Sequence, residues 1–395
     1  MSAATRAKKT ALVAGRTVVA LVAVATLVFS GYFWTALKLV KQNTNTTQIL
    51  NVLEDIPNSP AVEDGAMDIL LVGSDSRTDA QGRPLPPDVL RKLRTEGTDT
   101  VNTDTIIVMR VPRNGGKVSA ISIPRDTYVP IAGFREDKIN SAYGAVKYLT
   151  AERLQAEGVT DQQERERKSD EAGRKALVQA VQDLTGMRID HYAEINLYGF
   201  YLLTEVIGGV KVCLKAGTSD PNSGANFRAG EQVISGGDAL SFVRQRNMPG
   251  GDLGRIARQQ VFMSQAMKQL LSAGTFTDAG RLKGLLDAVS KSVVVDEKLD
   301  LATLAAQAQG LASGNVEFAT IPVTNIDARN ERGQSVVTVD RDAVRTWVAQ
   351  QIGETAKPVP SSTTPTTPAK FGPEKLLSLD GMHAVAAQQD VPCVD

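Results

Sequence analysis

The chain has 395 residues, which is enough for one large domain or two modest ones with additional tails. Lysine plus arginine and aspartate plus glutamate are equal at 44 each, so the formal net charge is zero. Nucleic-acid-binding proteins normally carry a basic excess, and this balance argues against nucleic acid as a partner. Any anion-binding site therefore has to come from a local cluster of charges.

An uncharged apolar stretch near the N-terminus predicts a single transmembrane helix. It runs from Thr17 to Leu37, and its length matches the roughly 20 residues that cross a bilayer. Residues 1–16 carry basic side chains, which should keep this flank in the cytoplasm and place the rest of the chain outside the cell membrane. A cleaved signal peptide is the alternative, although its apolar core is usually shorter.

Short apolar segments after the polar spacer of residues 38–66 predict the first strands of a sheet. The three predicted strands are Met67–Val72, Thr105–Val111 and Val118–Ile123. An Asn-Gly turn between the second and third predicts an antiparallel hairpin. Residues 78–101 are rich in proline, glycine and charge, and they predict a long loop.

Helices and strands alternate over the rest of the chain. Residues 139–184 predict mostly helix, with a charged, solvated stretch at 161–175. Further strands are predicted at 192–197, 210–214 and 316–322, and further helices between the first two of these and at 238–246, 255–271, 282–290, 301–311 and 341–351. This interleaving predicts an α/β fold, with a mixed central sheet flanked by helices.

The predicted organisation places a main domain between the spacer and a C-terminal region. The main domain spans residues 67–275, and 276–356 form the C-terminal part of the extracytoplasmic domain. Residues 357–371 are rich in proline and threonine and predict a linker, which is followed by a tail at 372–395. Cys213 and Cys393 are the only cysteines, and outside the cytoplasm they are expected to form a disulfide, with two free thiols as the alternative.

Several familiar catalytic patterns are missing from the sequence. It has two histidines, His191 and His383, and no GxSxG elbow, zinc-binding pattern, Walker loop or GxGxxG motif. Hydrolysis by an activated serine is therefore disfavoured. His191 is expected to be structural.

Charged side chains stand where the predicted strands begin or end. Asp75 and Arg77 follow the first strand, Asp104 precedes the second, and Arg125 and Asp126 follow the third. In a hairpin the start of one strand lies beside the end of the other, so Asp104 and Arg125 should share one edge of the sheet. Asp75 joins them if the first strand runs parallel to the third, and open α/β sheets bind ligands at such edges.

A second charged group lies further along the chain. It comprises Arg244, Arg246, Asp252, Arg255, Arg258 and Gln259. Arg255, Arg258 and Gln259 have i, i+3, i+4 spacing and share a helix face. Guanidinium groups match phosphate oxygens, and paired carboxylates beside them would repel an anion unless they held a cation such as Mg²⁺. Together the two groups predict a metal–diphosphate site.

Each of these residues also has a structural interpretation. Asp252 fits the N-cap of a helix that starts near Leu253. Asp75 fits a turn, and the arginines fit surface ion pairs that contribute little to stability. The site interpretation is favoured because all of these residues occur together in a chain with this predicted membrane topology.

At these residues the sequence resembles the LytR-CpsA-Psr family of bacterial cell-envelope proteins. The matching stretches are LLVGSDSR (70–77), NTDTIIVMRV (102–111), SAISIPRDTYVPI (119–131), DKINSAYG (137–144), IDHYAEINLYGF (189–200), VIGGVKVCL (206–214) and GGDALSFVRQRNMPGGDLGRIARQQVF (236–262). Their order and spacing fit the family over residues 67–272. Three patterns are specific in combination: SIPRD, KIN-AY and the string R-x-R…D-x-GR-x-x-RQ within residues 236–262.

The resemblance implies a phosphotransferase that moves a glycopolymer from a polyprenyl-pyrophosphate carrier in the membrane to peptidoglycan. It assigns the pyrophosphate to Arg125, Arg244, Arg246 and Arg255, and Mg²⁺ to Asp75 and Asp104. Asp252 or Asp126 would accept the proton of the sugar hydroxyl. The family also implies an apolar channel for the prenyl tail between the sheet and the helices.

One position departs from the family pattern. Asn102 stands where the family often has an arginine, two residues before Asp104. That cationic contact is expected to be either missing or replaced by Arg77 or Arg258, and Gln259 is grouped with these two as a substrate-binding residue.

Other functions remain open at this point. A non-catalytic protein that binds prenyl-phosphate lipid as a carrier, sensor or scaffold is the main alternative. A prenyl-pyrophosphate pyrophosphatase that uses water as the acceptor is a second one. Transcription regulation is disfavoured, because the predicted cytoplasmic segment of residues 1–16 is too short for a DNA-binding helix-turn-helix.

Overall fold

The computed structural model describes residues 45–47, 65–79, 82–96, 101–113, 117–245, 251–270, 279–299, 316–353 and 391–394. The predicted transmembrane helix, the predicted helix at 301–311 and the predicted linker lie outside these residues. Within the described part of the chain, no helix combines the length and the hydropathy that a membrane span requires.

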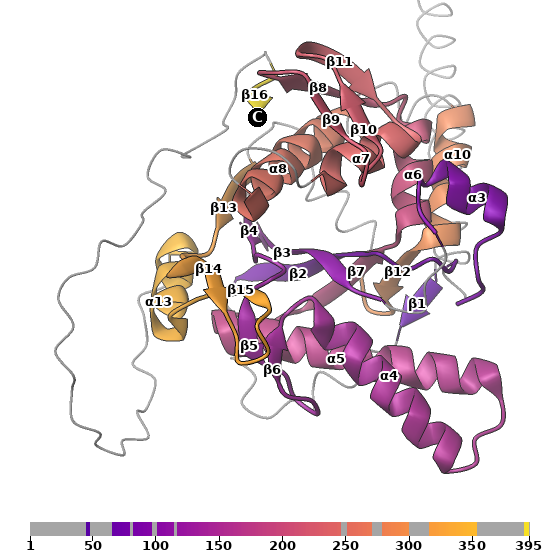
Figure 1. The fold of residues 1–395 in the computed structure, drawn as a ribbon, viewed down its shortest axis with the longest axis vertical. Coiled ribbons are helices and arrows are strands. Elements are labelled where there is room, and N and C mark those ends of the chain that lie inside the picture. The colour runs from indigo at the N-terminus through magenta and orange to yellow at the C-terminus, as the bar shows by residue number, and fades with distance from the viewer. Residues whose placement is uncertain are drawn as a thin grey trace, which may run out of the picture. The chain divides into compact units, whose positions relative to one another are not determined.

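A mixed sheet of seven strands forms the centre of the fold (Figure 1). In spatial order its strands are β1 (Asn45–Thr47), β12 (Val293–Asp296), β7 (His191–Ile195), β2 (Ala66–Ser74), β3 (Thr103–Pro112), β4 (Val118–Ser122) and β13 (Val316–Thr320). β3 runs antiparallel to both β2 and β4, as the hairpin pattern predicts. β2 therefore runs in the same direction as β4, and it also pairs in parallel with β7.

One face of the sheet is covered by the helical hairpin of α4 (Ser141–Ala156) and α5 (Gln162–Thr185), as predicted for 139–184 (Figure 1). The Asp161 carboxylate caps α5 by accepting from the main-chain N–H groups of residues 163 and 164. Gly186 ends the helix in the left-handed conformation, at φ 74°. Leu177 and Val181 of α5 pack in one cluster with Leu70 and Val108 of the sheet, so burial of this apolar face holds the hairpin in place.

The opposite side of the sheet carries α6 (Leu197–Val206), α7 (Gly236–Arg244), α8 (Gly251–Leu270) and α10 (Ala279–Ser292) (Figure 1). Met267 of α8 packs against Met67, Ile69 and Met109, whose side chains point away from α5. α8 begins at Gly251, so Asp252 lies inside the helix and not at the predicted N-cap.

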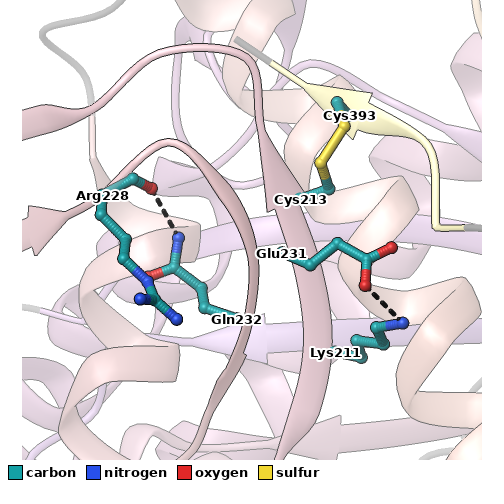
Figure 2. Close-up of a disulfide and its surroundings, with 6 residues drawn as sticks. All are labelled: Lys211, Cys213, Arg228, Glu231, Gln232 and Cys393. Atoms are coloured by element: carbon teal, nitrogen blue, oxygen red, sulfur yellow. Dashed lines mark hydrogen bonds and ion pairs between the residues drawn. A yellow bond between two sulfur atoms is a disulfide. The ribbon is translucent and has the colours of Figure 1, made fainter.

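A smaller sheet lies beyond these helices and forms a second core with them. Its order is β11 (Gly230–Ile234), β8 (Val210–Leu214) and β16 (Cys393–Val394), beside the hairpin of β9 (Thr218–Asp220) and β10 (Ala225–Phe227). Phe227, Phe242 and Phe262 meet in this core. Cys393 pairs with Cys213 in parallel register, and the two form the predicted disulfide, with Cα atoms 4.3 Å apart (Figure 2).

The predicted loop at 78–101 contains a short helix, α3 (Pro87–Lys92). This part of the loop prediction is wrong because Pro86 and Pro87, counted as loop formers, stand at the helix start, where proline is well tolerated. Leu93 follows the helix and packs with Leu85, Leu197 and Leu240, which anchors α3 to α6 and α7.

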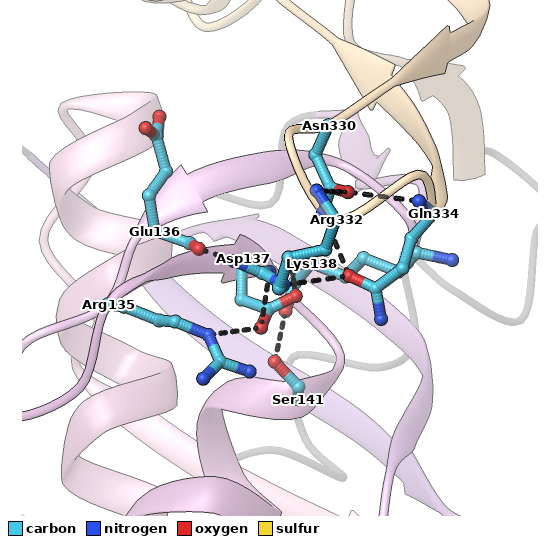
Figure 3. Close-up of polar contacts among 8 residues, drawn as sticks. All are labelled: Arg135, Glu136, Asp137, Lys138, Ser141, Asn330, Arg332 and Gln334. Carbon is cyan, nitrogen blue, oxygen red and sulfur yellow. Dashed lines mark hydrogen bonds and ion pairs between the residues drawn. The ribbon is translucent and has the colours of Figure 1, made fainter.

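The C-terminal region packs against the turn that follows β4. The hairpin of β14 (Asn325–Arg329) and β15 (Ser335–Thr338) lies beside the hairpin of β5 (Tyr128–Pro130) and β6 (Glu136–Lys138). The N–H of Val337 donates to the carbonyl of Asp126 at 2.8 Å. Arg332 pairs with Asp137 at 2.8 Å, and Figure 3 shows this cluster of polar contacts. The last helix, α13 (Arg341–Gln351), packs on α5 through Val344 and Val348.

Candidate active site

The sheet brings Asp75, Asp104 and Arg125 to one edge, as the strand directions predict. Ser74 at the end of β2 pairs with Thr103 at the start of β3, and Asp75 and Asp104 directly follow these two residues, so Asp104 lies just inside β3 and not before it as predicted. Arg125 follows the end of β4, and its Nη1 donates to Oδ1 of Asp104 at 2.7 Å. The side chain of Arg125 is only 8% exposed, so its charge is held near the carboxylate in a partly desolvated setting.

Asp75 is fixed by its own main chain and by two neighbours. Its N–H donates to the carbonyl of Asn102 at 2.9 Å, and Oδ1 accepts the N–H of Asn102 at 2.6 Å. Arg77 pairs with Oδ2 at 3.1 Å. Burial raises the pKa of Asp75 and the Asp104 carboxylate raises it further, while the Asn102 N–H and Arg77 act in the opposite direction. The site therefore holds two carboxylates that repel each other.

Arg244 stands at the last position of α7 and faces the same edge of the sheet. Its Nη2 donates to the carbonyl of Leu93 at 2.9 Å, which orients the guanidinium. Burial lowers the pKa of Arg244, and the positive charges of Arg77 and Arg94 lower it further, against the attraction of Asp104 and Asp75. A guanidinium with cationic neighbours is stabilised when an anion binds between them.

These side chains surround a polar cavity of about 440 Å³. It is lined by Asp75, Arg77, Asp104, Arg125, Leu197, Asp220, Asn222, Ser223, Val243, Arg244 and Arg255. The concentration of arginines suits an anion with several oxygens, because guanidinium groups bind phosphate oxygens in pairs.

An apolar recess of about 80 Å³ adjoins the polar cavity. Its apolar walls come from Ile107, Ile195, Leu197, Phe200, Leu240, Val243, Phe262 and Met263. Asp75, Asp104 and Arg244 border both spaces, so the charged cluster stands at the mouth of the recess. Phe200 and Phe262 stack with ring centroids 5.3 Å apart inside it. The recess lies between the sheet and helices α6, α7 and α8, where the family resemblance implies a channel.

Other predicted site residues are spread around this centre. Arg255 lines the polar cavity, and Gln259 lines the recess while donating to the carbonyl of Val243 at 3.1 Å. Arg258 is buried and donates to the carbonyl of Gln245 at 2.6 Å, away from both spaces. Of the two candidates to replace the arginine missing at Asn102, only Arg77 therefore faces the cavity.

Asp126 pairs with Lys138, whose Nζ lies 3.0 Å from Oδ1, while its Oδ2 lies 3.8 Å from Nε of Arg125. It is not among the residues that line either space. Asp252 lies in the first turn of α8, and its side chain is outside the described part of the structure, as is all of Arg246.

Sequence reasoning missed Asp220, Asn222 and Ser223, which form one wall of the polar cavity. They lie in the turn between β9 and β10, where small polar residues are ordinary turn formers, so their types gave no sign of a site. His191, by contrast, is structural as expected, since its Nδ1 lies 3.1 Å from the buried Asp296 carboxylate.

Fold and cavity together define an α/β protein with an arginine-rich anion site at the edge of its sheet and an apolar recess behind it. The model of the family described as LytR_cpsA_psr matches residues 34–352. The chain therefore belongs to the LytR-CpsA-Psr family, as its motifs suggest.

Two curated relatives give the family context. The chain is 48% identical over 346 residues to the cell wall biosynthesis protein LcpA of Corynebacterium glutamicum, a match that covers 87% of this chain and 66% of LcpA. It is 32% identical over 239 residues to the polyisoprenyl-teichoic acid–peptidoglycan teichoic acid transferase TagU of Oceanobacillus iheyensis, covering 60% of this chain and 61% of TagU. The chain thus spans just under two thirds of these relatives' lengths.

Solved structures show the same fold at low sequence identity. TagV of B. subtilis superposes with a TM-score of 0.52 at 20% identity, over 75% of this chain and 100% of TagV. A protein of Streptococcus agalactiae, gbs0355, gives a TM-score of 0.53 at 20% identity, over 74% of this chain and 89% of that one. The mixed central sheet flanked by helices is therefore the architecture of this family.

Proposed function

We propose that this chain is a phosphotransferase that moves a glycopolymer from a polyprenyl-pyrophosphate lipid to peptidoglycan during cell-wall assembly. The names of two relatives support the proposal, since LcpA is a cell wall biosynthesis protein and TagU a teichoic acid transferase that acts on peptidoglycan.

The observation that carries the proposal is the junction between the polar cavity and the apolar recess. A polyprenyl-pyrophosphate has a charged head joined directly to a hydrocarbon tail. Arg244 borders both spaces, and Arg77, Arg125 and Arg255 line the polar one. A head bound among the arginines would thus have its first isoprene units directed at the recess.

The chemistry follows from this placement. The acceptor hydroxyl forms a bond to the phosphorus that carries the glycan, and the bond from that phosphorus to the prenyl phosphate breaks. Charge builds on the phosphate oxygens, which Arg125, Arg244 and Arg255 would stabilise. The hydroxyl proton passes to a carboxylate, for which Asp252 remains our candidate, because Asp126 is paired with Lys138 outside the cavity.

Asp75 and Asp104 fit a Mg²⁺ site. Both carboxylates line the polar cavity and they repel each other, and the buried Oγ of the adjacent Ser74 has no hydrogen-bond partner among the described residues. The described residues contain no cluster of three or more potential metal-ligating side chains. Mg²⁺ commonly takes one or two carboxylates and completes its shell with phosphate oxygens and water. Bound there, it would neutralise charge on the diphosphate.

Membrane attachment belongs to the same proposal. The apolar stretch Thr17–Leu37 would hold the protein in the bilayer that contains the lipid donor, with the main domain outside the cell. Donor and enzyme would then meet on one surface.

The test is transfer of a labelled glycan from its polyprenyl-pyrophosphate lipid to peptidoglycan oligomers by the full chain in detergent, with Mg²⁺. Arg244→Ala should lower the rate by about 100-fold or more, the usual cost of removing one preorganised charge partner. Arg228→Ala, which removes an exposed arginine outside the cavity, is the matched control and should leave the rate unchanged.

Two outcomes would contradict the proposal. Release of prenyl phosphate to water with no peptidoglycan product would identify a pyrophosphatase. Tight lipid binding with no turnover in the presence of Mg²⁺ and acceptor would identify a carrier or scaffold. Full activity of Arg244→Ala would remove the site assignment while leaving the reaction in place.

A further inference from the structure

The walls of the polar cavity differ in charge. One wall carries Arg77, Arg125, Arg244 and Arg255 with the two aspartates, whereas the turn between β9 and β10 contributes Asp220, Asn222 and Ser223 and no cation. We propose that this turn, residues 220–224, is a binding subsite for the hydroxyl groups of a sugar. The inference rests on the proposed function, since it names what the second wall of that cavity binds.

The side chains of the turn suit a neutral ligand with many hydroxyl groups. A carboxylate such as that of Asp220 offers acceptor oxygens, so it suits O–H donors better than a phosphate. The Asn222 amide both donates and accepts, and no described residue bonds it. A diphosphate held by the arginines would therefore direct its sugar substituents toward the turn.

Hydrogen bonds within the turn order its side chains without a ligand. Oδ1 of Asp220 accepts the N–H of Asn222 at 3.1 Å, and Oδ2 accepts the Ser223 hydroxyl at 2.8 Å. The strands on both sides pair in register, from Asp220 with Ala225 to Thr218 with Phe227. Binding groups that are already ordered lose little entropy when they bind, which is what a recognition site requires.

Arg94 connects the turn to Arg244 through hydrogen bonds. Its Nη1 donates to the carbonyl of Gly224 at 2.8 Å and to Oγ of Ser241 at 3.1 Å, and its Nη2 pairs with Asp238 at 2.6 Å. Its carbonyl accepts from Nη2 of Arg244 at 3.4 Å. Arg94 is the only non-glycine residue of the described chain with a positive φ, at 51°. Such strained backbone persists where the surroundings enforce it, and here the conformation sets the spacing between Arg244 and the turn.

Two sugars could occupy the subsite, and both present the same hydroxyl chemistry. One is the first sugar of the donor glycan and the other is the sugar that carries the attacking hydroxyl. The test uses Asn222→Ala in the full chain, with Asn226→Ala as the matched control. Asn226 lies in the same hairpin and is exposed, but it does not line the cavity.

Steady-state kinetics should show whether the subsite binds the donor sugar or the acceptor sugar. Loss of one or two hydrogen bonds predicts a rise of about 3- to 10-fold in one KM for Asn222→Ala, with none for Asn226→Ala. A rise in the KM of the peptidoglycan oligomer assigns the subsite to the acceptor, and a rise in the KM of the glycan lipid assigns it to the donor. Arg94→Ala should change the same KM, because the turn loses its tie to Arg244.

An equilibrium measurement keeps this inference separate from the proposed reaction. The full chain is titrated with the glycan lipid, with bare polyprenyl pyrophosphate and with the peptidoglycan oligomer. Asn222→Ala should weaken one sugar ligand by the same factor and leave bare polyprenyl pyrophosphate unaffected, whether or not the wild type transfers glycan. If Asn222→Ala matches the wild type with all three ligands, or weakens bare polyprenyl pyrophosphate equally, the turn is not a sugar subsite.

Discussion

The Arg125 guanidinium donates to the Asp104 carboxylate at 2.7 Å, although the two residues lie at opposite ends of a hairpin in the sequence. Asp104 is the second residue of β3, Arg125 follows the end of β4, and antiparallel pairing of the strands makes them neighbours. The contact holds a cation and an anion ready on one edge of the sheet. It also makes each residue sensitive to the loss of the other.

Arg125→Lys separates the charge of this side chain from its shape. Lysine keeps the positive charge but lacks the planar fork that binds two phosphate oxygens. We expect the transfer rate to fall by about 100-fold, with the protein still folded. The measurement is glycan transfer, together with a thermal melt. Arg113→Lys, at an exposed position just after β3, is the control, and equal activity of the two variants would show that the fork is not needed.

Asp75→Asn should stabilise the protein at neutral pH and weaken its response to Mg²⁺. Because the fold raises the pKa of Asp75 above 3.8, folding favours its protonated form. The ionised carboxylate therefore lowers the free energy of unfolding above the raised pKa, and this effect disappears as the pH falls below 3.8. The gain in melting temperature should be present at pH 7 and lost in acid.

The same variant tests the metal proposal. Mg²⁺ that binds the folded state raises the melting temperature of the wild type, and it should raise that of Asp75→Asn much less. Asp79→Asn, which removes a carboxylate paired with Arg83, should behave as the wild type with Mg²⁺. An identical Mg²⁺ response in all three proteins would exclude Asp75 as a ligand.

Removal of the disulfide should destabilise the small sheet. Cys213 and Cys393 close a loop of 180 residues, and the loss of such a bridge usually costs about 2–5 kcal/mol. Cys393→Ser should lower the free energy of unfolding by this amount in a denaturant titration. Reductant should lower the stability of the wild type to the level of the variant and leave the variant unchanged. A reductant effect on Cys393→Ser would mean that it acts elsewhere.

Filling the apolar recess should block the lipid tail but not the head. Val243 borders both the recess and the polar cavity, so Val243→Phe places extra volume at the junction. We expect the affinity for a long polyprenyl pyrophosphate to fall by about 10-fold, while inorganic pyrophosphate binds as before. Val233→Phe is the control at an exposed site on β11. Equal loss of both ligands would place the tail elsewhere.

Much of this site could be predicted because its residues flank strands. The apolar runs predict the strand positions, and the Asn-Gly turn predicts the antiparallel hairpin that brings Asp104 and Arg125 together. That Asp75 joins them depends on the direction of β2, which the sequence left open and the structure shows to be that of β4. The disulfide was also predictable, from the topology and a cysteine count of two. The residue types and spacing in the arginine-rich segment 236–262 predicted Arg244 and Arg255 as site residues.

The remaining features depend on contacts that no local pattern encodes. Asp126 adjoins Arg125 in the sequence, yet Lys138 and the β14–β15 hairpin hold it outside the cavity. Arg94 has no motif, and its role follows from a backbone conformation and from partners more than a hundred residues away. Arg258 shares a helix face with Arg255 by spacing, but burial against Gln245 gives it a structural partner instead of a ligand.

The strand β13 has a consequence for the behaviour of the protein at high concentration. It pairs with β4 from Val118–Val316 to Ser122–Thr320 and so occupies the outer side of an apolar strand. Without it, β4 would present an unpaired row of N–H and C=O groups, which is a template for pairing with other chains. β13 is itself the edge strand and is less buried than β4, so a fragment ending at 275 would move the edge to the more apolar β4, and we expect it to aggregate more readily.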